Sequence, residues 1–444
     1  VFKKLEQAGH IYENEIIQLY CNTDKKFLPD RYVIGTCPYC KADDQYSDLC
    51  EKCGRVPAEI ENPHCSICGQ TPVKEKTKHY FFKLKNFSNK LSQYLESNQN
   101  LQKDVKKYVQ NWIKEGLIDW DITRDISWGV PIPVDDEKGK VFYGWFDNHL
   151  AYISSAIKFL NDTGKDGKKF WNESDIYHFI GKDIVYHHYL FLPAMRLGIG
   201  EEYKLPDYIP TRGHLTLQSK KISKSRNWYI GLKDFLGIFP ADYLRFYLIS
   251  INSYSQDDLN FDWDEFATKI NSELIGNFGN LVNRVLGFTV KSFNGIVPDP
   301  DEFDNMDKES EKMIKEFMLD LGILMEENHL DRALKKILQF SAHFNQYFQH
   351  KEPWKNGAGT NSCVFLSVNA VKSLAIAIYP FLPESSQKIW SQLGLDGDIS
   401  VHMFDEISSI TLKQGHKLGS VSPLFEKVEE SIIEEQKSKL GAIS

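Results

Sequence analysis

"SKKISKSRN", residues 219–227, carries four cationic side chains among serines and one apolar residue. It follows a strand-like stretch, "YIPTRGHLTL" (208–217). Lysine is a compact charge on a flexible stem, so it can follow phosphate oxygens as they move. A mobile lysine loop after a strand therefore suits a polyphosphate ligand, although a solvated surface run is the alternative when the loop is taken alone. The chain has no G-x4-GK[ST] motif, which disfavours an ordinary P-loop nucleotidase.

Length and composition set the limits for the rest of the chain. The 444 residues are 42% hydrophobic and rich in aromatic side chains, which suffices for two to four domains with real cores. The net charge of −8 gives no global attraction for nucleic acid, so any such contact needs local basic patches. No apolar run approaches a membrane span, and no secretory signal is visible, so we expect a cytoplasmic protein without a membrane partner.

The order of apolar and polar residues predicts two kinds of structure. Residues 128–216 alternate strand-like and helix-like stretches, as in half of a parallel α/β sheet. From about residue 265, apolar side chains recur at three- and four-residue spacing, for example Leu274, Phe278 and Leu281. This spacing is typical of a helical bundle. The fold class is therefore α/β plus all-α.

Two cysteine pairs predict a metal centre. Cys37-x2-Cys40 and Cys50-x2-Cys53 are separated by nine residues. A two-residue spacing lets a tight turn direct both thiolates at one ion, and two such turns complete a tetrahedral zinc site. A chain without an export signal favours metal binding over disulfides. The sites have no open coordination position, so their role is structural.

A third pair, Cys65-x2-Cys68, needs partners of its own. Cys21-x2-Asp24 upstream offers a thiolate and a carboxylate, and both are legitimate zinc ligands. One interpretation is a second zinc site with three cysteines and one aspartate. The other is that Cys21 is a core thiol and Asp24 a turn residue, without a metal. From spacing alone, the pair at 50 and 53 could also join the pair at 65 and 68.

Several segments together resemble one family. "KISKS" (221–225) is similar to the KMSKS signature of class I aminoacyl-tRNA synthetases. The other segments narrow the resemblance to methionyl-tRNA synthetases, with a cysteine region of the archaeal type. They run through the chain in order: "FLPDRYVIGTCPYC" (27–40), "DWDITRDISWGVPIP" (119–133), "YGWFD" (143–147), "HFIGKDIVYHH" (178–188) and "EPW" (352–354).

The resemblance implies a domain organisation. The family has a Rossmann catalytic domain split by an insertion with zinc knuckles, then a linking domain with the KMSKS loop and an anticodon-binding helical bundle. The expected divisions are a remnant of the first Rossmann half (1–12), the insertion (13–127, with knuckles in 13–80), the second Rossmann half (128–216), the linking domain (217–264), the bundle (265–425) and a charged C-terminal tail (426–444).

The resemblance also implies an activity and a nucleotide site. The family activates methionine with ATP, with Mg²⁺, and transfers it from methionyl-adenylate to tRNA(Met). Lys221, Ser223 and Lys224 match the signature loop, whose lysines neutralise the pyrophosphate leaving group, so both lysines are expected to be catalytic. Gly181 and Asp183, in "IGKDI", match the ribose site of ATP, where a carboxylate accepts hydroxyl groups at the end of a strand.

Further matched positions concern methionine and tRNA. Asn280, Arg284 and Trp354 match anticodon readers, and stacking and edge hydrogen bonds suit these residue types. Arg124 matches a position near the active site. Asn148 and His149 stand where Ala-Pro is common, and one pocket residue, at 187, replaces a more usual Phe. The residues at methionine-pocket positions are Trp120, Trp145, Tyr152, Ile184, His187 and His188. Aromatic edges suit a polarizable thioether, although core packing explains each residue nearly as well.

For the cysteines, the resemblance implies two separate zinc sites. Cys37, Cys40, Cys50 and Cys53 form one site. The other takes Cys21, Cys65 and Cys68, and Asp24 stands where a fourth cysteine is expected.

One expected motif is absent from these residues. Class I synthetases carry an HIGH signature opposite the KMSKS lysines, but none of the Gly-His pairs here reads H-x-G-H. We therefore expect an N-terminal catalytic segment as a further partner, and a catalytic deficiency of these 444 residues alone. The alternatives are a non-catalytic zinc- and tRNA-binding fragment, or a class I synthetase for another apolar amino acid.

Overall fold

The structure is a computed structural model that describes residues 1–47, 50, 57, 59–134, 139–200, 202–224 and 226–441. The chain divides into two compact units, Val1–Thr211 and Arg212–Ser444. Each unit is described by itself below.

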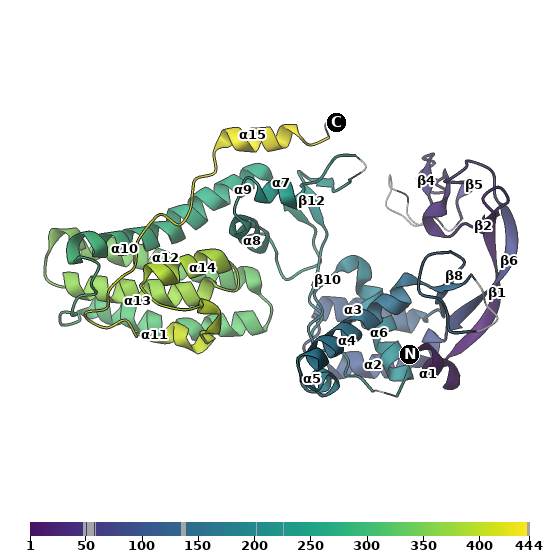
Figure 1. The fold of residues 1–444 in the computed structure, drawn as a ribbon, viewed down its shortest axis with the longest axis horizontal. Coiled ribbons are helices and arrows are strands. Elements are labelled where there is room, and N and C mark those ends of the chain that lie inside the picture. The colour runs from purple at the N-terminus through teal and green to yellow at the C-terminus, as the bar shows by residue number, and fades with distance from the viewer. Residues whose placement is uncertain are drawn as a thin grey trace. The chain divides into compact units, whose positions relative to one another are not determined.

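The first unit combines an antiparallel ribbon with helices (Figure 1). Its helical elements are α1 (Phe2–Gln7), η1 (Asp30–Tyr32), η2 (Leu84–Phe87), α2 (Ser88–Ser97), α3 (Lys103–Glu115), α4 (Gly144–Asp162), α5 (Gly167–Glu173), η3 (Lys182–Ile184), η4 (His187–Phe191) and α6 (Leu192–Gly198). Its strands are β1 (Ile11–Cys21), β2 (Lys26–Phe27), β3 (Val33–Thr36), β4 (Gln45–Tyr46), β5 (Glu61–Cys65), β6 (Val73–Phe82), β7 (Trp120–Asp121), β8 (Thr123–Arg124), β9 (Val141–Phe142), β10 (Ile180–Gly181) and β11 (Thr211–Arg212).

The ribbon positions the cysteines. β1 and β6 pair antiparallel from Ile11↔Phe82 to Tyr20↔Val73, within the order β2-β1-β6-β7. At the end of the ribbon where β1 reaches Cys21, a small sheet of order β4-β3-β5 follows. Its core is small, with Leu28 and Val33 beside buried cysteines. A core of this size gives little stability by itself, so cross-linking by a metal suits this region.

The rest of the first unit packs around one apolar core. It is lined mainly by α2, α3, η4 and α6, with Leu91, Val105 and Tyr189 among its fully buried residues. β10 pairs with β11 beside this core. α4 and the turn after β10 bring aromatic and histidine side chains together, as described below.

The second unit begins with a small sheet and continues as helices. The sheet has the order β13-β12-β14, with β12 (Leu215–Leu217) antiparallel to β13 (Lys220–Lys221) and parallel to β14 (Leu259–Phe261). The helical elements are α7 (Leu232–Leu236), α8 (Ala241–Ser250), α9 (Trp263–Lys269), η5 (Ile270–Gly279), α10 (Asn280–Phe293), α11 (Asn305–Glu326), α12 (Leu330–Lys351), η6 (Pro353–Lys355), α13 (Thr360–Ile378), α14 (Pro383–Gln392), η7 (Ile399–Val401), η8 (Phe404–Ser408) and α15 (Glu430–Ser438).

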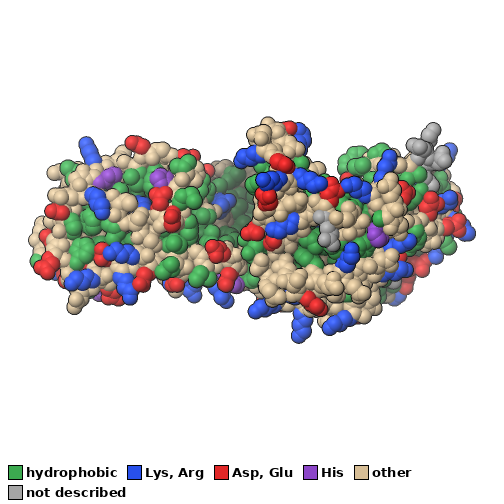
Figure 2. All heavy atoms as spheres, turned by 90° about the horizontal axis from the view of Figure 1, so that it is seen from below, with side chains coloured by type: hydrophobic (Ala, Val, Ile, Leu, Met, Phe, Trp, Pro, Cys, Tyr) green, Lys and Arg blue, Asp and Glu red, His purple; other side chains and the backbone are tan. Residues whose placement is uncertain are grey.

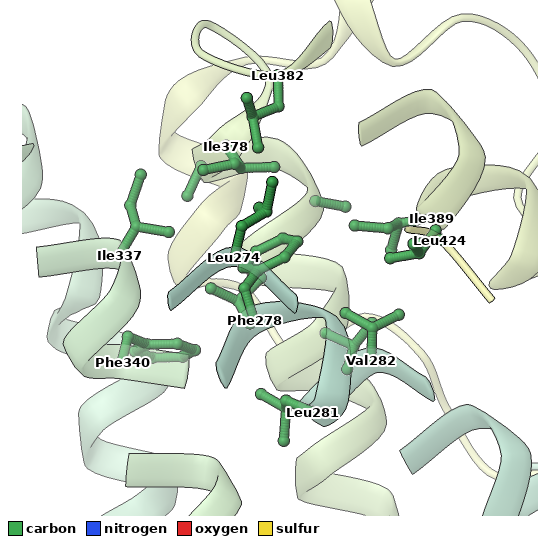
Figure 3. Packing of buried hydrophobic residues seen from close by; sticks show 14 of the residues in the cluster. Leu274, Phe278, Leu281, Val282, Ile337, Phe340, Ile378, Leu382, Ile389 and Leu424 are labelled. Atoms are coloured by element: carbon green, nitrogen blue, oxygen red, sulfur yellow. The ribbon is translucent and has the colours of Figure 1, made fainter. Parts of the chain in front are cut away.

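The bundle core is apolar and closely packed. Figure 3 shows Leu274 and Phe278 of η5 among Ile337 and Phe340 of α12 and Ile378 of α13. The three- and four-residue spacing seen in the sequence thus turns one face of each helix towards a common core.

α13 corrects one expectation from the sequence. This helix of 19 residues has a mean hydropathy of 1.5, so it is long and apolar enough to cross a membrane. The statement that no apolar run approaches that length was therefore wrong. The window is 94% buried inside the bundle, which is also what a central core helix requires.

Some elements cross the expected domain divisions. β1 crosses residues 12 and 13, β12 crosses 216 and 217, and α9 crosses 264 and 265. The charged segment from 426 contains α15, whose Ile433 is 1% exposed, so part of this segment is packed against the protein.

Candidate functional site

The cysteine turns share one backbone pattern. Residues 21–26, 37–42 and 65–70 each place a positive φ at the fifth position, of 51°, 57° and 72°. In the second and third turns, the N–H of the first cysteine donates to the carbonyl of the sixth residue, at 2.8 and 2.9 Å. This turn directs the side chains of its first and fourth residues to one side. Asp24 is the fourth residue of the first turn, in the place of the second cysteine of the others.

The first cluster that could hold a metal ion contains Cys37, Cys40 and Cys50. Their sulfur atoms all lie within 4.8 Å of one another, and those of Cys40 and Cys50 are 3.6 Å apart. Burial opposes ionisation of Cys37, but N–H donors of residues 39 and 40 and the neighbouring thiols outweigh it, so its pKa falls to about 7. Cys53, the fourth expected ligand, lies outside the described residues. The alternative in which Cys50 joins the cysteines at 65 and 68 is excluded.

The second cluster contains Cys21, Asp24, Cys65 and Cys68, again with all ligand atoms within 4.8 Å. Asp24 Oδ2 lies 3.2 Å from the sulfur of Cys21 and 3.1 Å from that of Cys65, and the sulfurs of Cys21 and Cys68 are 3.4 Å apart. Ligands about 2.3 Å from one tetrahedral ion lie about 3.8 Å apart, so both clusters are close to this geometry. The thiols of Cys68, Cys65 and Cys21 lower the pKa of Asp24 by hydrogen bonding.

The lysine loop is anchored by two strands and leaves its lysines exposed. β13 ends at Lys221, and Ser223 exchanges two backbone hydrogen bonds with Trp228, at 2.9 and 2.8 Å. The side chains of Lys221 and Lys224 make no ion pair or hydrogen bond with any residue that the structure describes, and both residues are exposed. Ser225 is outside the described residues. The loop therefore presents two cations that no protein carboxylate neutralises in the described part of the chain.

Gly181 and Asp183 form a tight turn at the end of β10. The exposed Asp183 lies in the single turn η3 that follows the strand. A Cβ on Gly181 would lie 2.5 Å from Asp183 Oδ1, so the carboxylate folds back over the strand end into space that a larger residue would occupy.

The residues at the expected methionine-pocket positions lie together in the first unit. Trp145 and His187 have ring centroids 4.4 Å apart, and Trp120 lies 6.1 Å from the same histidine. Tyr152 O–H and His188 Nε2 are 3.1 Å apart. His188 Nδ1 lies 3.0 Å from the carbonyl of Ile184, which can only accept. Nδ1 therefore carries the proton, and neutral His188 accepts from the tyrosine at Nε2.

Two further histidines belong to this group and were not assigned from the sequence. His149 lies 5.5 Å from His187 and 5.3 Å from His188, and His178 lies 4.6 Å from Tyr152, as ring-centroid distances. His149 is 1% exposed, and its Nε2 has no hydrogen-bond partner among the residues that the structure describes. The spacing of Trp145, His149 and Tyr152 on one face of α4 was the available signal.

Burial controls the charge of these histidines. It lowers the pKa of His149 to about 2, of His178 to about 3 and of His187 to about 4, and it also lowers that of His188. All four are therefore neutral near pH 7. The histidine group is therefore polar but carries no net charge near pH 7.

In the second unit, the three expected anticodon readers lie along one seam. Asn280 and Arg284 are one turn apart on α10, and Arg284 lies 5.1 Å from the ring centroid of Trp354. Asn280 Nδ2 donates to Asn345 Oδ1 at 3.0 Å, and Arg284 donates to Gln349 Oε1 at 2.6 Å. Both acceptors are on α12 and were missed in the sequence. Trp354 is 42% exposed, so its ring is accessible for stacking.

The surface carries charges of both signs. Figure 2 shows acidic and basic side chains interspersed over one face of the molecule, in keeping with a net charge of −8. An RNA ligand would therefore be held by particular side chains and not by a field of one sign.

Comparison with known proteins decides the family. Residues 1–286 match the family described as "tRNA synthetases class I (M)", and residues 297–444 match the "Anticodon binding domain of methionyl tRNA ligase". The chain belongs to the methionyl-tRNA synthetase family.

Curated relatives agree with this assignment. The methionine–tRNA ligase of Methanopyrus kandleri is 41% identical over 99% of this chain, and that of Methanosphaera stadtmanae is 39% identical over 100%. The chain spans 66% and 67% of the length of these two proteins.

Solved structures show the same fold. A methionyl-tRNA synthetase of Mycobacterium tuberculosis in complex with methionyl-adenylate has a TM-score of 0.76 and 23% identity. The match covers 96% of this chain and 79% of that one. The resemblance to methionyl-tRNA synthetases is thus confirmed, as is the sequence of a class I catalytic domain and a helical anticodon-binding domain. The individual site residues remain predictions.

Proposed function

We propose that this protein acts as a methionine–tRNA ligase in the cytoplasm. It would form methionyl-adenylate from methionine and ATP and then transfer methionine to tRNA(Met). The observation that carries the proposal is the 41% identity to a methionine–tRNA ligase over 99% of the chain. The local geometry of three candidate sites is in accord with it.

The nucleotide would be held from two elements. Asp183 at the end of β10 is suited to accept ribose hydroxyls, and Gly181 leaves space for its carboxylate. Lys221 and Lys224, with Ser223 between them, would approach the phosphates of ATP, which enters with Mg²⁺. Charge on the leaving pyrophosphate develops during the reaction, so unpaired lysines on an exposed loop are well suited to stabilise it. β10 and β11 would belong to the second part of a split Rossmann domain.

Methionine would be bound by the aromatic and histidine group of the first unit. Trp145, Tyr152 and Ile184 offer apolar surface to a thioether. The carbonyl of Ile184 fixes the tautomer of His188, whose Nε2 accepts from Tyr152, and burial keeps the group neutral. A neutral group of side chains suits the uncharged methionine side chain better than a charged group would, because binding then leaves no desolvated charge unpaired.

Zinc fits both cysteine clusters by donor chemistry and spacing. Cys37, Cys40 and Cys50 would bind the first ion, with Cys53 as the fourth ligand. The second site would have three thiolates and the Asp24 carboxylate. Zinc accepts sulfur and carboxylate ligands in a closed tetrahedral shell, which supports a structural role in the insertion.

The bundle would bind the anticodon of tRNA(Met). Trp354 would stack on a base, and Asn280 and Arg284 would donate to base edges, on which unpaired RNA is commonly read. The hydrogen bonds to Asn345 and Gln349 hold both donors in place before RNA binds.

The experiment is methionine-dependent exchange of pyrophosphate into ATP by the full-length protein. We expect exchange with methionine and little with leucine or isoleucine. Preference for either of these would favour a synthetase for another apolar amino acid.

The same assay on the isolated 444 residues tests a second point. They contain no H-x-G-H motif, so we propose that they depend on an additional catalytic segment and are deficient alone. Vigorous exchange by this polypeptide would contradict that. Absence of exchange from the full-length protein as well would favour a non-catalytic zinc- and tRNA-binding role.

A further inference from the structure

The C-terminal residues 419–441, here called the strap, run back from the bundle towards the lysine loop. Within the second unit, Figure 1 shows this last part of the chain passing along the helices and ending near β12. The strap starts at Gly419, whose N–H donates to the carbonyl of Gln392 at 3.0 Å. It therefore begins on α14 of the bundle and ends beside a different functional element.

The middle of the strap is hydrogen-bonded to two helices. Tyr243 O–H of α8 donates to the carbonyl of Glu426 at 2.7 Å and accepts from its N–H at 2.8 Å. The side-chain amide of Asn271 forms a similar pair with the backbone of Val428, both at 2.9 Å. A Cβ on Gly279 would lie 2.8 Å from the Phe425 ring, so the glycine makes room for the strap. These hydrogen bonds and this close contact hold the extended backbone of the strap in one position, whereas a loosely attached tail would have no such fixed partners.

The strap then forms α15, which lies against α9. Lys437 Nζ lies 2.6 and 2.7 Å from the two carboxylate oxygens of Asp264. Ile433 is 1% exposed beneath the helix. On the same helix, Lys439 pairs with Glu435 of α15 itself, at 2.7 Å, and with no other carboxylate in the described part of the chain. Lys437 is thus a link between elements, and Lys439 provides its matched control.

The end of the strap meets the base of the lysine loop. Gly441 N–H donates to the carbonyl of Asn227 at 2.8 Å. Gly441 has a φ of 74°, and a Cβ on it would lie 3.4 Å from the Trp228 ring. Asn227 itself has a φ of 50°, a conformation that is uncommon for residues other than glycine. The strap therefore contacts the strained residue at which the loop returns to the sheet.

That position acts as a hinge of the loop. Trp228 is fixed by its indole N–H, which donates to the carbonyl of Leu217 at 2.8 Å, and by Lys220, 4.4 Å above its ring. Lys224 lies between the paired residues Ser223 and Trp228, and the N–H of Asn227 donates to its carbonyl at 3.1 Å. Fixing the backbone at Asn227 consequently restricts the positions that Lys224 can reach.

We infer that the strap positions the lysine loop: through the Gly441–Asn227 hydrogen bond, it holds the C-terminal hinge so that Lys224 is presented in a defined place. Gly441, Lys437 and Asp264 are positioning residues and do not themselves reach a substrate. The consequence for catalysis rests on the proposed ligase function, whereas the restraint on the loop does not.

The first test measures amide hydrogen exchange at Ser223, Asn227 and Trp228 without substrates. We compare the unchanged protein with a truncation after Glu429 and with Gly441→Pro, which removes the donor and cannot adopt the positive φ. Both should accelerate exchange at these amides about tenfold or more, while amides of α12 and α13 stay protected. Lys437→Ala should give a smaller increase, because exposed ion pairs contribute little. Lys437→Arg should keep these amides as protected as in the unchanged protein, and Lys439→Ala should have no effect on them.

The second test uses methionine-dependent exchange kinetics of the full-length protein. The truncation and Gly441→Pro should lower kcat about tenfold and leave KM for methionine unchanged. The inference is overturned if the loop amides exchange equally fast with and without the strap, or if kcat stays unchanged after they are deprotected. If the unchanged protein shows no methionine-dependent exchange, the ligase proposal fails, and the amide measurement still decides whether the strap restrains the loop.

Discussion

The two units differ in what stabilises them. The first, Val1–Thr211, depends on specific polar arrangements: two cysteine clusters and a group of four histidines, three of them buried, that must stay neutral. The second, Arg212–Ser444, depends on a large apolar core in which α13 is buried along nearly its whole length. The first unit should therefore respond to metals and protons, and the second to loss of apolar volume.

The largest difference should appear when metal is removed. A strong chelator should unfold the region of β3, β4 and β5, because its own core is small and metal binding would supply its folding energy. The bundle should keep its helical signal. Circular dichroism with thermal unfolding, alongside zinc analysis, checks both points.

Single variants sharpen this test. Cys37→Ser should remove one zinc per chain, whereas Cys363→Ala should remove none, because Cys363 is buried in α13 and belongs to neither cluster. Asp24→Ala should weaken the second site. Zinc content unchanged by both Cys37→Ser and Asp24→Ala would show that these clusters hold no zinc.

Acid should also affect the first unit more than the second. His149, His178 and His187 have folded pKa values of about 2, 3 and 4, below the ordinary value near 6.5. The unfolded chain therefore binds more protons below pH 6.5, and stability falls as the pH falls from there. Between pH 6.5 and 5, each such histidine costs about 1.5 kcal/mol of stability. Denaturant unfolding monitored separately in the two units checks this.

Replacement of the central histidine provides a control for the acid effect. His149→Gln removes one titrating group, so the stability of the first unit should depend less steeply on pH below 6.5. An unchanged pH dependence would show that these histidines do not determine the acid response.

Removing apolar volume from the bundle core should instead destabilise the second unit more than the first. Phe344 of α12 is fully buried, 4.9 Å from the ring of Phe340, and Phe344→Ala should cost about 3–5 kcal/mol in the second unit. Leu319→Ala, at a side chain 59% exposed on α11, should change stability by less than about 0.5 kcal/mol. Zinc content should be the same in both variants. Equal losses of stability would contradict the assignment of this core.

The sequence predicted those parts of the molecule that follow local rules. Helical periodicity located the bundle, and the two-residue cysteine spacing located the turns. It could not pair the turns, since that depends on how β3 and β5 fold back. Nor could it predict that Lys372 is buried in α13, where its Nζ donates to the carbonyl of Glu406 at 2.6 Å.

The same limit applies to the candidate sites. His149 could have been found from its spacing on α4. His178 joins the histidine group only because it packs against Tyr152 of α4, and no local pattern shows this. Residues 426–444 were predicted to be a charged tail, because Asn271 and Asp264, which bind this part of the strap, lie more than 150 residues away along the chain. The resemblance to methionyl-tRNA synthetases supplied what spacing could not, since it relates distant segments to one family.

The central claim is that the lysine loop serves methionine activation and the bundle serves tRNA recognition. The most direct test compares Lys224→Ala with Trp354→Ala in the full-length protein, measuring pyrophosphate exchange without tRNA and charging of tRNA(Met). We expect Lys224→Ala to reduce both activities by about 100-fold or more, as loss of a charge-stabilising group does. Trp354→Ala should leave exchange unchanged and weaken tRNA charging by about 1–3 kcal/mol. Unchanged exchange in Lys224→Ala, or unchanged charging in Trp354→Ala, would contradict the account.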